Sequence, residues 1–63
     1  MKMLRITGCT DPSMWYAEKV GQLVPFEWEW PEGYASREPD GYINIVHFHD
    51  AEIVEIESTE AEG

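Results

Sequence analysis

The segment from Leu23 to Trp30, Leu-Val-Pro-Phe-Glu-Trp-Glu-Trp, constrains the fold more than any other stretch. Its apolar side chains recur at every second position, at Val24, Phe26, Trp28 and Trp30. Side chains alternate between the two faces of a strand, so this spacing predicts one apolar, largely aromatic face backed by a charged one. A helix would scatter the same residues around its circumference. Pro25 has no backbone donor, which predicts an edge or bulged position for it.

The length of the chain permits one small domain. A domain of about 60 residues hides only about 60% of the surface that its unfolded chain exposes, so its core leaves little room for a deep pocket. Hydrophobic residues form 43% of the 63 residues and aromatic residues 13%, which is enough to build such a core. We therefore expect one folded domain over residues 1–57, followed by a disordered acidic tail over residues 58–63. The small core also argues against an enzyme.

Acidic residues dominate the charge of the chain. There are 13 Asp and Glu residues against 4 Lys and Arg residues, and the formal net charge is -9. Direct nucleic-acid binding depends on Lys and Arg side chains that neutralise phosphates, so four dispersed basic residues argue against it. An anionic membrane surface is disfavoured for the same reason. The acidity fits either a solubility device or a surface that meets a basic partner.

Two further features of the sequence indicate the cellular compartment. No run approaches the ~20 apolar residues of a membrane span, and the first residues do not form the apolar region of a signal peptide. Cys9 is the single cysteine, so the chain cannot form an internal disulfide. These features lead us to expect a protein of the reducing cytoplasm.

Turn signals divide the rest of the chain into short elements. Besides residues 22–30, we expect strands over residues 3–9, 34–38, 42–49 and 51–57, and a short helical turn over residues 14–20 between Asp11-Pro12 and Gly21. A sheet this small must curl to hide its aromatic face and its edges. The prediction is therefore a mainly β protein, a small, partly open barrel of four to five strands with one short helical turn. The alternative is a sheet with a single helix packed across it.

Three motifs carry a resemblance to a known family: Trp15-Tyr16, then Gly21-Gln22-Leu23-Val24-Pro25-Phe26, and finally His49-Asp50-Ala51-Glu52-Ile53-Val54. Together they resemble the short SH3-like barrel proteins of bacteria and their phages, most of them uncharacterised. The resemblance covers most of the chain and implies a fold but little chemistry. The chain lacks the Ala-Leu-Tyr-Asp-Tyr stretch and the paired tryptophans of signalling SH3 domains. Binding of proline-rich peptides is therefore not implied.

Candidate catalytic and metal-binding groups are sparse. His47 and His49 lie two apart on an expected strand, so both could reach one metal, with Asp50 or Glu52 as a third ligand. Two solvent-facing histidines are the simpler interpretation, and the metal question stays open. Cys9 could act as a nucleophile, but a lone cysteine is more often a small buried hydrophobic residue. We expect no cofactor and no catalytic residues.

The eight aromatic residues exceed what so small a core can bury. We expect Trp15, Val24, Phe26 and Trp28 in the core. Trp30, Tyr34 and Tyr42 lie near turns, and exposed Trp and Tyr residues dominate protein interfaces. Our leading hypothesis is therefore a non-enzymatic module of bacterial or phage origin that binds another protein, as a monomer or a homodimer, through exposed aromatic residues in an acidic surface.

The acidic end of the chain supports an alternative function. Glu52, Glu55 and Glu57 all lie on the last expected strand, and no Lys or Arg follows Arg37. Regular carboxylates could imitate spaced phosphates, so the alternative is an acidic inhibitor or nucleic-acid mimic of a host DNA- or RNA-handling protein. A simpler interpretation is a solvated edge strand whose charges prevent aggregation. The predicted partner-binding set is thus Trp30, Tyr34, Tyr42, Glu52, Glu55 and Glu57.

Overall fold

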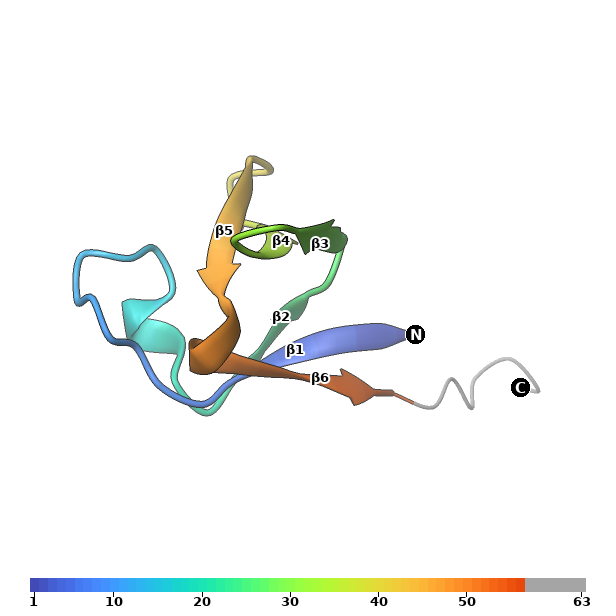
Figure 1. The fold of residues 1–63 in the computed structure, drawn as a ribbon, viewed down its shortest axis with the longest axis horizontal. Helices are drawn as coiled ribbons and strands as arrows, with labels where there is room; N and C mark the ends of the chain where they lie inside the picture. Colours follow the sequence, from blue (N-terminus) through green and yellow to red (C-terminus); the bar gives the residue numbers. More distant parts are fainter. Residues whose placement is uncertain (57–63) are drawn as a thin grey trace.

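The computed structural model describes residues 1–56 (Figure 1). Their elements are six strands and two 3-10 turns, in the order β1 (Lys2–Ile6), η1 (Ala17–Lys19), β2 (Leu23–Pro25), β3 (Trp28–Trp30), β4 (Gly33–Arg37), β5 (Ile43–His47), η2 (Phe48–Asp50) and β6 (Ala51–Glu55). The prediction of a mainly β protein is confirmed. The predicted tail over residues 58–63, and Glu57 before it, lie outside the described residues.

The strands form two antiparallel three-stranded sheets, ordered β2-β1-β6 and β3-β4-β5. In the first sheet the first and last strands of the described chain pair along their whole lengths, from Lys2 opposite Glu55 to Ile6 opposite Ala51. Neither sheet closes into a barrel. The strand count exceeds the predicted four to five because the segment 22–30 is divided between the two sheets.

The division of that segment occurs at Phe26 and Glu27, which belong to neither strand. β2 lies at the edge of its sheet, as Pro25 predicted, and the chain then bends and enters the other sheet as β3 (Figure 1). The backbone N–H of Glu27 donates to the carbonyl of Ala35 at 2.8 Å, although Ala35 pairs with Trp28 in the register. The expectation of one continuous strand is wrong, because this bulge turns the chain from one sheet to the other.

The core lies between the two sheets and under the long β1–β2 connection. Its buried residues are Leu4, Ile6, Tyr16, Val24, Val46 and Ala51, and Trp15, Phe26 and Tyr34 pack against them half-buried. Each fully buried aliphatic side chain contributes about 1.5–3 kcal/mol. A hydrogen bond from Ser36 Oγ to the carbonyl oxygen of Pro25, at 2.6 Å, links β4 to β2 and so ties the two sheets together.

The β1–β2 connection contains only a short 3-10 turn, η1, where a helical turn over residues 14–20 was expected. Asp11 accepts hydrogen bonds from the backbone N–H and the hydroxyl of Ser13, and these bonds lower the pKa of Asp11. Gly21 follows η1 with φ at 89°, in the left-handed region that favours glycine. Among residues 1–56, none of the helical turns is long and apolar enough to cross a membrane.

Side chains of this connection form hydrogen bonds with the backbone of β5 along the edge that has no neighbouring strand. The indole Nε1–H of Trp15 donates to the carbonyl of Ile45 at 2.9 Å, and the backbone N–H of His47 donates to the Tyr16 hydroxyl at 3.3 Å. Buried backbone groups need such partners, because an unpaired one costs as much as a lost hydrogen bond. The Trp15-Tyr16 pair therefore replaces a neighbouring strand along this edge.

Candidate functional site

The strand register places two tryptophans on the outer face of the sheet β3-β4-β5. Trp28 pairs with Ala35, and Trp30 pairs with Gly33. Residues directly opposite one another share a face, so these four lie on one side, together with Ile43 and Ile45 of β5. The other side carries Tyr34, Ser36 and Val46, which point toward β2 and the core. We call Trp28, Trp30, Ile43 and Ile45 the aromatic face.

The two tryptophans contact each other edge to face. Their ring centroids lie 6.1 Å apart and their planes meet at 82°. Trp28 keeps 46% of its surface exposed, while Trp30 is half-buried. Trp28 was expected in the core, and this expectation is wrong because the bend at Phe26 and Glu27 separates its face from that of Val24. A large exposed aromatic surface of this kind is typical of interface hot spots.

Small residues on the middle strand shape this face. Gly33 and Ala35 are buried beneath their larger neighbours. A Cβ atom at Gly33 would lie 2.6 Å from the Val46 carbonyl oxygen and 2.9 Å from Ile45 Cγ1. Ile45 therefore leans over Gly33, which only a glycine permits. The position of β5 against β4, and with it the aliphatic half of the aromatic face, depends on this close approach.

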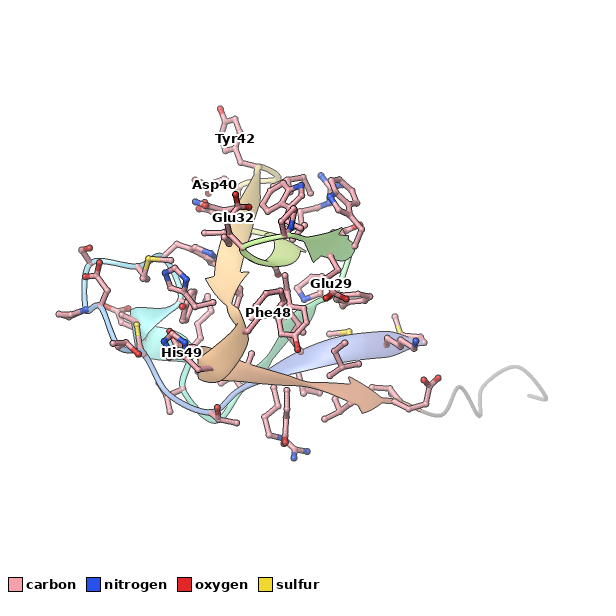
Figure 2. All side chains as sticks on the ribbon, in the orientation of Figure 1. Glu29, Glu32, Asp40, Tyr42, Phe48 and His49 are labelled. Carbon is pink, nitrogen blue, oxygen red and sulfur yellow. The ribbon has the colours of Figure 1, made fainter. Side chains whose placement is uncertain are left out.

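Acidic side chains surround the same sheet. Glu29 lies on β3, Glu32 in the β3–β4 turn and Asp40 in the β4–β5 turn, and all three are exposed (Figure 2). Glu27 is half-buried and accepts a hydrogen bond from Arg37 Nε at 3.3 Å. Glu29 pairs with Tyr34 and so points to the inner side of the sheet, whereas Arg37, which pairs with Ile43, lies on the aromatic face together with its partner Glu27. The exposed carboxylates of Glu32 and Asp40, in the turns at the ends of the strands, therefore leave an excess of negative charge beside the aromatic face. This charge favours a partner with positive charge beside its apolar surface.

The other predicted aromatic residues lie elsewhere. Tyr42 is 71% exposed and projects from the end of the β4–β5 hairpin (Figure 2). Tyr34 is half-buried on the inner side of the sheet, edge to face against Phe26 at 6.0 Å and Phe48 at 4.9 Å. Of the three predicted aromatic contacts, only Trp30 shares the face of Trp28. The parity that Trp28 shares with Trp30 is the sequence signal that could have identified Trp28.

Two of the acidic residues predicted to bind a partner, Glu52 and Glu55, lie on β6 in the other sheet. Glu52 and Glu55 are exposed, and each is ion-paired: Glu52 with Arg5 at 3.1 Å and Glu55 with the N-terminal ammonium of Met1 at 3.0 Å. Glu57 lies outside the described residues. Among residues 1–56, the structure therefore does not bring the predicted aromatic and acidic residues together into one site.

The two histidines lie side by side at the end of β5. Their rings stack with centroids 5.7 Å apart and planes 3° from parallel. His49 Nε2 is 2.9 Å from Thr10 Oγ1 and 3.7 Å from Asp50 Oδ1. Within residues 1–56, no group of three or more His, Cys, Asp or Glu side chains is arranged to hold a metal ion. The Cys9 thiol donates to the Asp11 carbonyl at 3.0 Å.

Asp50 is the centre of a buried polar network. Its side chain is almost fully buried and accepts hydrogen bonds from the Tyr16 hydroxyl at 2.5 Å and from Thr10 Oγ1 at 3.0 Å. Burial alone would raise the pKa of Asp50, but the hydrogen bonds from Tyr16 and Thr10 outweigh burial and lower it. This network fastens the β1–β2 connection to η2, so we assign Asp50 a structural role.

Comparisons with known proteins identify no relative of this chain. No family model matches the chain, no curated protein is significantly similar to it in sequence, and no solved structure is significantly similar to it in fold. The function must therefore be argued from the surface of the molecule itself.

Proposed function

We propose that this protein is a non-enzymatic binding module that captures another protein on its aromatic face. The observation that carries the proposal is the exposure of Trp28, packed against Trp30 on the outer side of a sheet. Burying one such ring removes about 150–250 Å² from water, and truncating a hot-spot tryptophan costs about 2 kcal/mol or more of binding free energy. The surrounding carboxylates favour a partner whose apolar surface is bordered by Lys or Arg.

Replacement of Trp28 tests this proposal directly. We expect Trp28→Ala to weaken partner capture at least about 30-fold, the equivalent of ~2 kcal/mol. The measurement is capture of partners from a host lysate by immobilised protein, followed by affinity determination with the partner identified. Circular dichroism and urea denaturation establish that the variant is folded, which the exposure of Trp28 leads us to expect.

Ile53→Ala is the matched control. Ile53 is 40% exposed, close to the exposure of Trp28, but lies on β6 in the other sheet. This variant should capture the partner as well as the wild type does. Equal capture by wild type and Trp28→Ala, or equal losses in both variants, would show that the aromatic face is not the binding surface.

We extend this proposal to the type of fold, the origin of the protein and its cellular location. We propose an SH3-like, partly open barrel because one sequence segment supplies a strand to each of two small packed sheets. A bacterial or phage origin rests on the sequence resemblance, and a cytoplasmic location on the single cysteine and the weak hydropathy. A solved structure would test the first, and the identity of the captured partner would test the others.

Nucleic-acid mimicry stays a prediction. The carboxylates that would imitate phosphates include those of Glu52 and Glu55, and both are ion-paired within the protein. The aromatic face therefore has more support. Charge reversal at Glu52 and Glu55 separates the two functions, since it should abolish capture by a mimic and leave capture by the aromatic face intact.

A further inference from the structure

A second candidate site lies between η1, β2 and the C-terminal end of β4. Here the surface is hollowed into a groove of about 240 Å³ with apolar walls, formed by Trp15, Val24, Pro25 and Pro39. None of its lining residues belongs to β3, and its one link to the aromatic face is Arg37, which pairs with Ile43. Pockets for drug-sized ligands measure about 300–1,000 Å³. A smaller hollow fits one or two side chains of a peptide.

The walls of this groove are held in place. The Trp15 indole is fixed by its hydrogen bond to the Ile45 carbonyl. Pro25 is anchored through its carbonyl, which accepts the Ser36 hydroxyl, and the backbone angle φ of both prolines is restricted by their rings. Such a preformed site loses little conformational entropy when it binds a ligand.

The rim of the groove carries two of the four basic residues, Lys19 and Arg37, and one acid, Glu38. Arg37 is occupied by Glu27 and by the Gly41 carbonyl, and Glu38 accepts a hydrogen bond from Asn44 Nδ2 at 2.6 Å. Within residues 1–56, the Lys19 ammonium has no ion-pair or hydrogen-bond partner. The groove therefore presents an unpaired cation beside an apolar hollow.

We propose that this groove binds the C-terminal residue of a partner peptide, with an aliphatic side chain in the hollow and the α-carboxylate against Lys19. A C-terminal leucine supplies an apolar group and one negative charge within a single residue, which matches the size of the hollow. A segment with several acidic residues would be repelled by the net charge of -9. One carboxylate incurs much less of this repulsion.

The probe is the tripeptide acetyl-Gly-Gly-Leu with a free carboxylate, compared with the same peptide as its C-terminal amide. Titration is followed in ¹H–¹⁵N NMR spectra through the Trp15 indole N–H and the backbone amides of Lys19 and Val24. We expect the free acid to shift these signals in a saturable way. The amide, and separately the Lys19→Gln variant, should weaken binding about two- to fivefold, the effect of losing an exposed ion pair.

Two controls keep the outcome decisive. Lys2→Gln removes an exposed basic residue on β1 and should bind like the wild type. Trp28→Ala should also bind the peptide, so failure of the aromatic face and failure of the groove are distinguishable. Equal affinity for acid and amide, shifts that centre on the Trp28 and Trp30 indoles, or no saturable shift at millimolar peptide would each overturn the proposal.

Discussion

At the scale of single residues, the contact between Tyr16 and Asp50 is the most consequential. Asp50 retains only 2% of its surface exposed and Tyr16 none, so neither group is solvated by water. A buried carboxylate is stabilised only if hydrogen bonds replace its lost hydration. Tyr16 supplies the shortest of these bonds and also accepts from the backbone of β5. One hydroxyl thus joins the β1–β2 connection, β5 and η2.

This contact predicts a loss of stability in alkali. Burial, followed by the hydrogen bond to Asp50, raises the pKa of Tyr16 above its usual value of about 10. The folded state therefore keeps a proton that the unfolded state releases, and Tyr16 contributes stability that is lost as the pH rises above about 10. Urea denaturation between pH 8 and pH 11 should show the free energy of unfolding falling by up to about 1.4 kcal/mol per pH unit.

Tyr16→Phe should remove this additional alkaline slope, although the variant is less stable at neutral pH. Tyr42→Phe is the matched control, because Tyr42 is exposed at a turn and touches no buried carboxylate. It should keep the wild-type slope. An unchanged slope in Tyr16→Phe would contradict the prediction.

Asp50 acts at the acidic end of the pH range. Since its pKa is lowered in the folded state, its contribution to the free energy of unfolding is present above about pH 4 and is lost as the pH falls through the folded-state pKa.

At the scale of elements, the packing of β5 on β4 depends on Gly33. An added methyl group would meet the Val46 carbonyl, which is backbone and cannot rotate away. We expect Gly33→Ala to lower the free energy of unfolding by about 1–3 kcal/mol, the usual cost of overpacking. Urea denaturation at pH 7 measures this loss.

Gly8→Ala provides the comparison for Gly33→Ala. A Cβ atom at Gly8 would have no atom within 4 Å, and its φ is not in the left-handed region. This variant should match the wild type within about 0.5 kcal/mol or be slightly more stable. If both variants behaved alike, the close approach of β5 to Gly33 would not be what fixes the sheet.

The strands show how much of the secondary structure could be predicted from the sequence. Alternation predicted strands within residues 22–30, because a half-buried strand has a period of two, and turn signals placed the other strands near the observed ones. The same rule failed for Trp28, since alternation holds within a strand but not across the bulge at Phe26 and Glu27. In the strand expected over residues 42–49, apolar residues fall at both odd and even positions, so alternation alone does not identify its inward side. The structure resolves it, with Val46 inward and Ile43 and Ile45 outward.

Other features could not be predicted because they join residues distant in sequence. Asp50 and Tyr16 are separated by 34 positions, and no local pattern indicates that a carboxylate after a strand will be buried by a tyrosine from the first connection. The resemblance included both residues in its motifs but assigned neither of them a contact. The groove likewise combines residues from three elements.

At the scale of the whole molecule, the net charge of -9 predicts two opposite effects of salt. Salt screens the repulsion among the carboxylates, so raising NaCl from ~0.02 M to ~0.5 M should increase the free energy of unfolding, on the order of 1 kcal/mol. The same screening should slow association with a partner bordered by Lys and Arg, and leave the dissociation rate nearly unchanged.

Because the two effects have opposite signs, loss of capture at high salt cannot be caused by unfolding. Urea denaturation and surface plasmon resonance across one salt series measure them together. A dissociation rate that rises steeply with salt would indicate that ion pairs, and not the tryptophans, hold the complex.

The pairing of β1 with β6 also governs how this protein is made. β1 is the middle strand of its sheet, and one of its two neighbours is the last element of the described chain. On the ribosome, β1 emerges before β6 and must wait for about 50 residues before residues 51–55 can join it. Such distant pairing makes folding slow compared with that of helical domains. The sheet is therefore completed only after Glu55 has been synthesised and released from the exit tunnel.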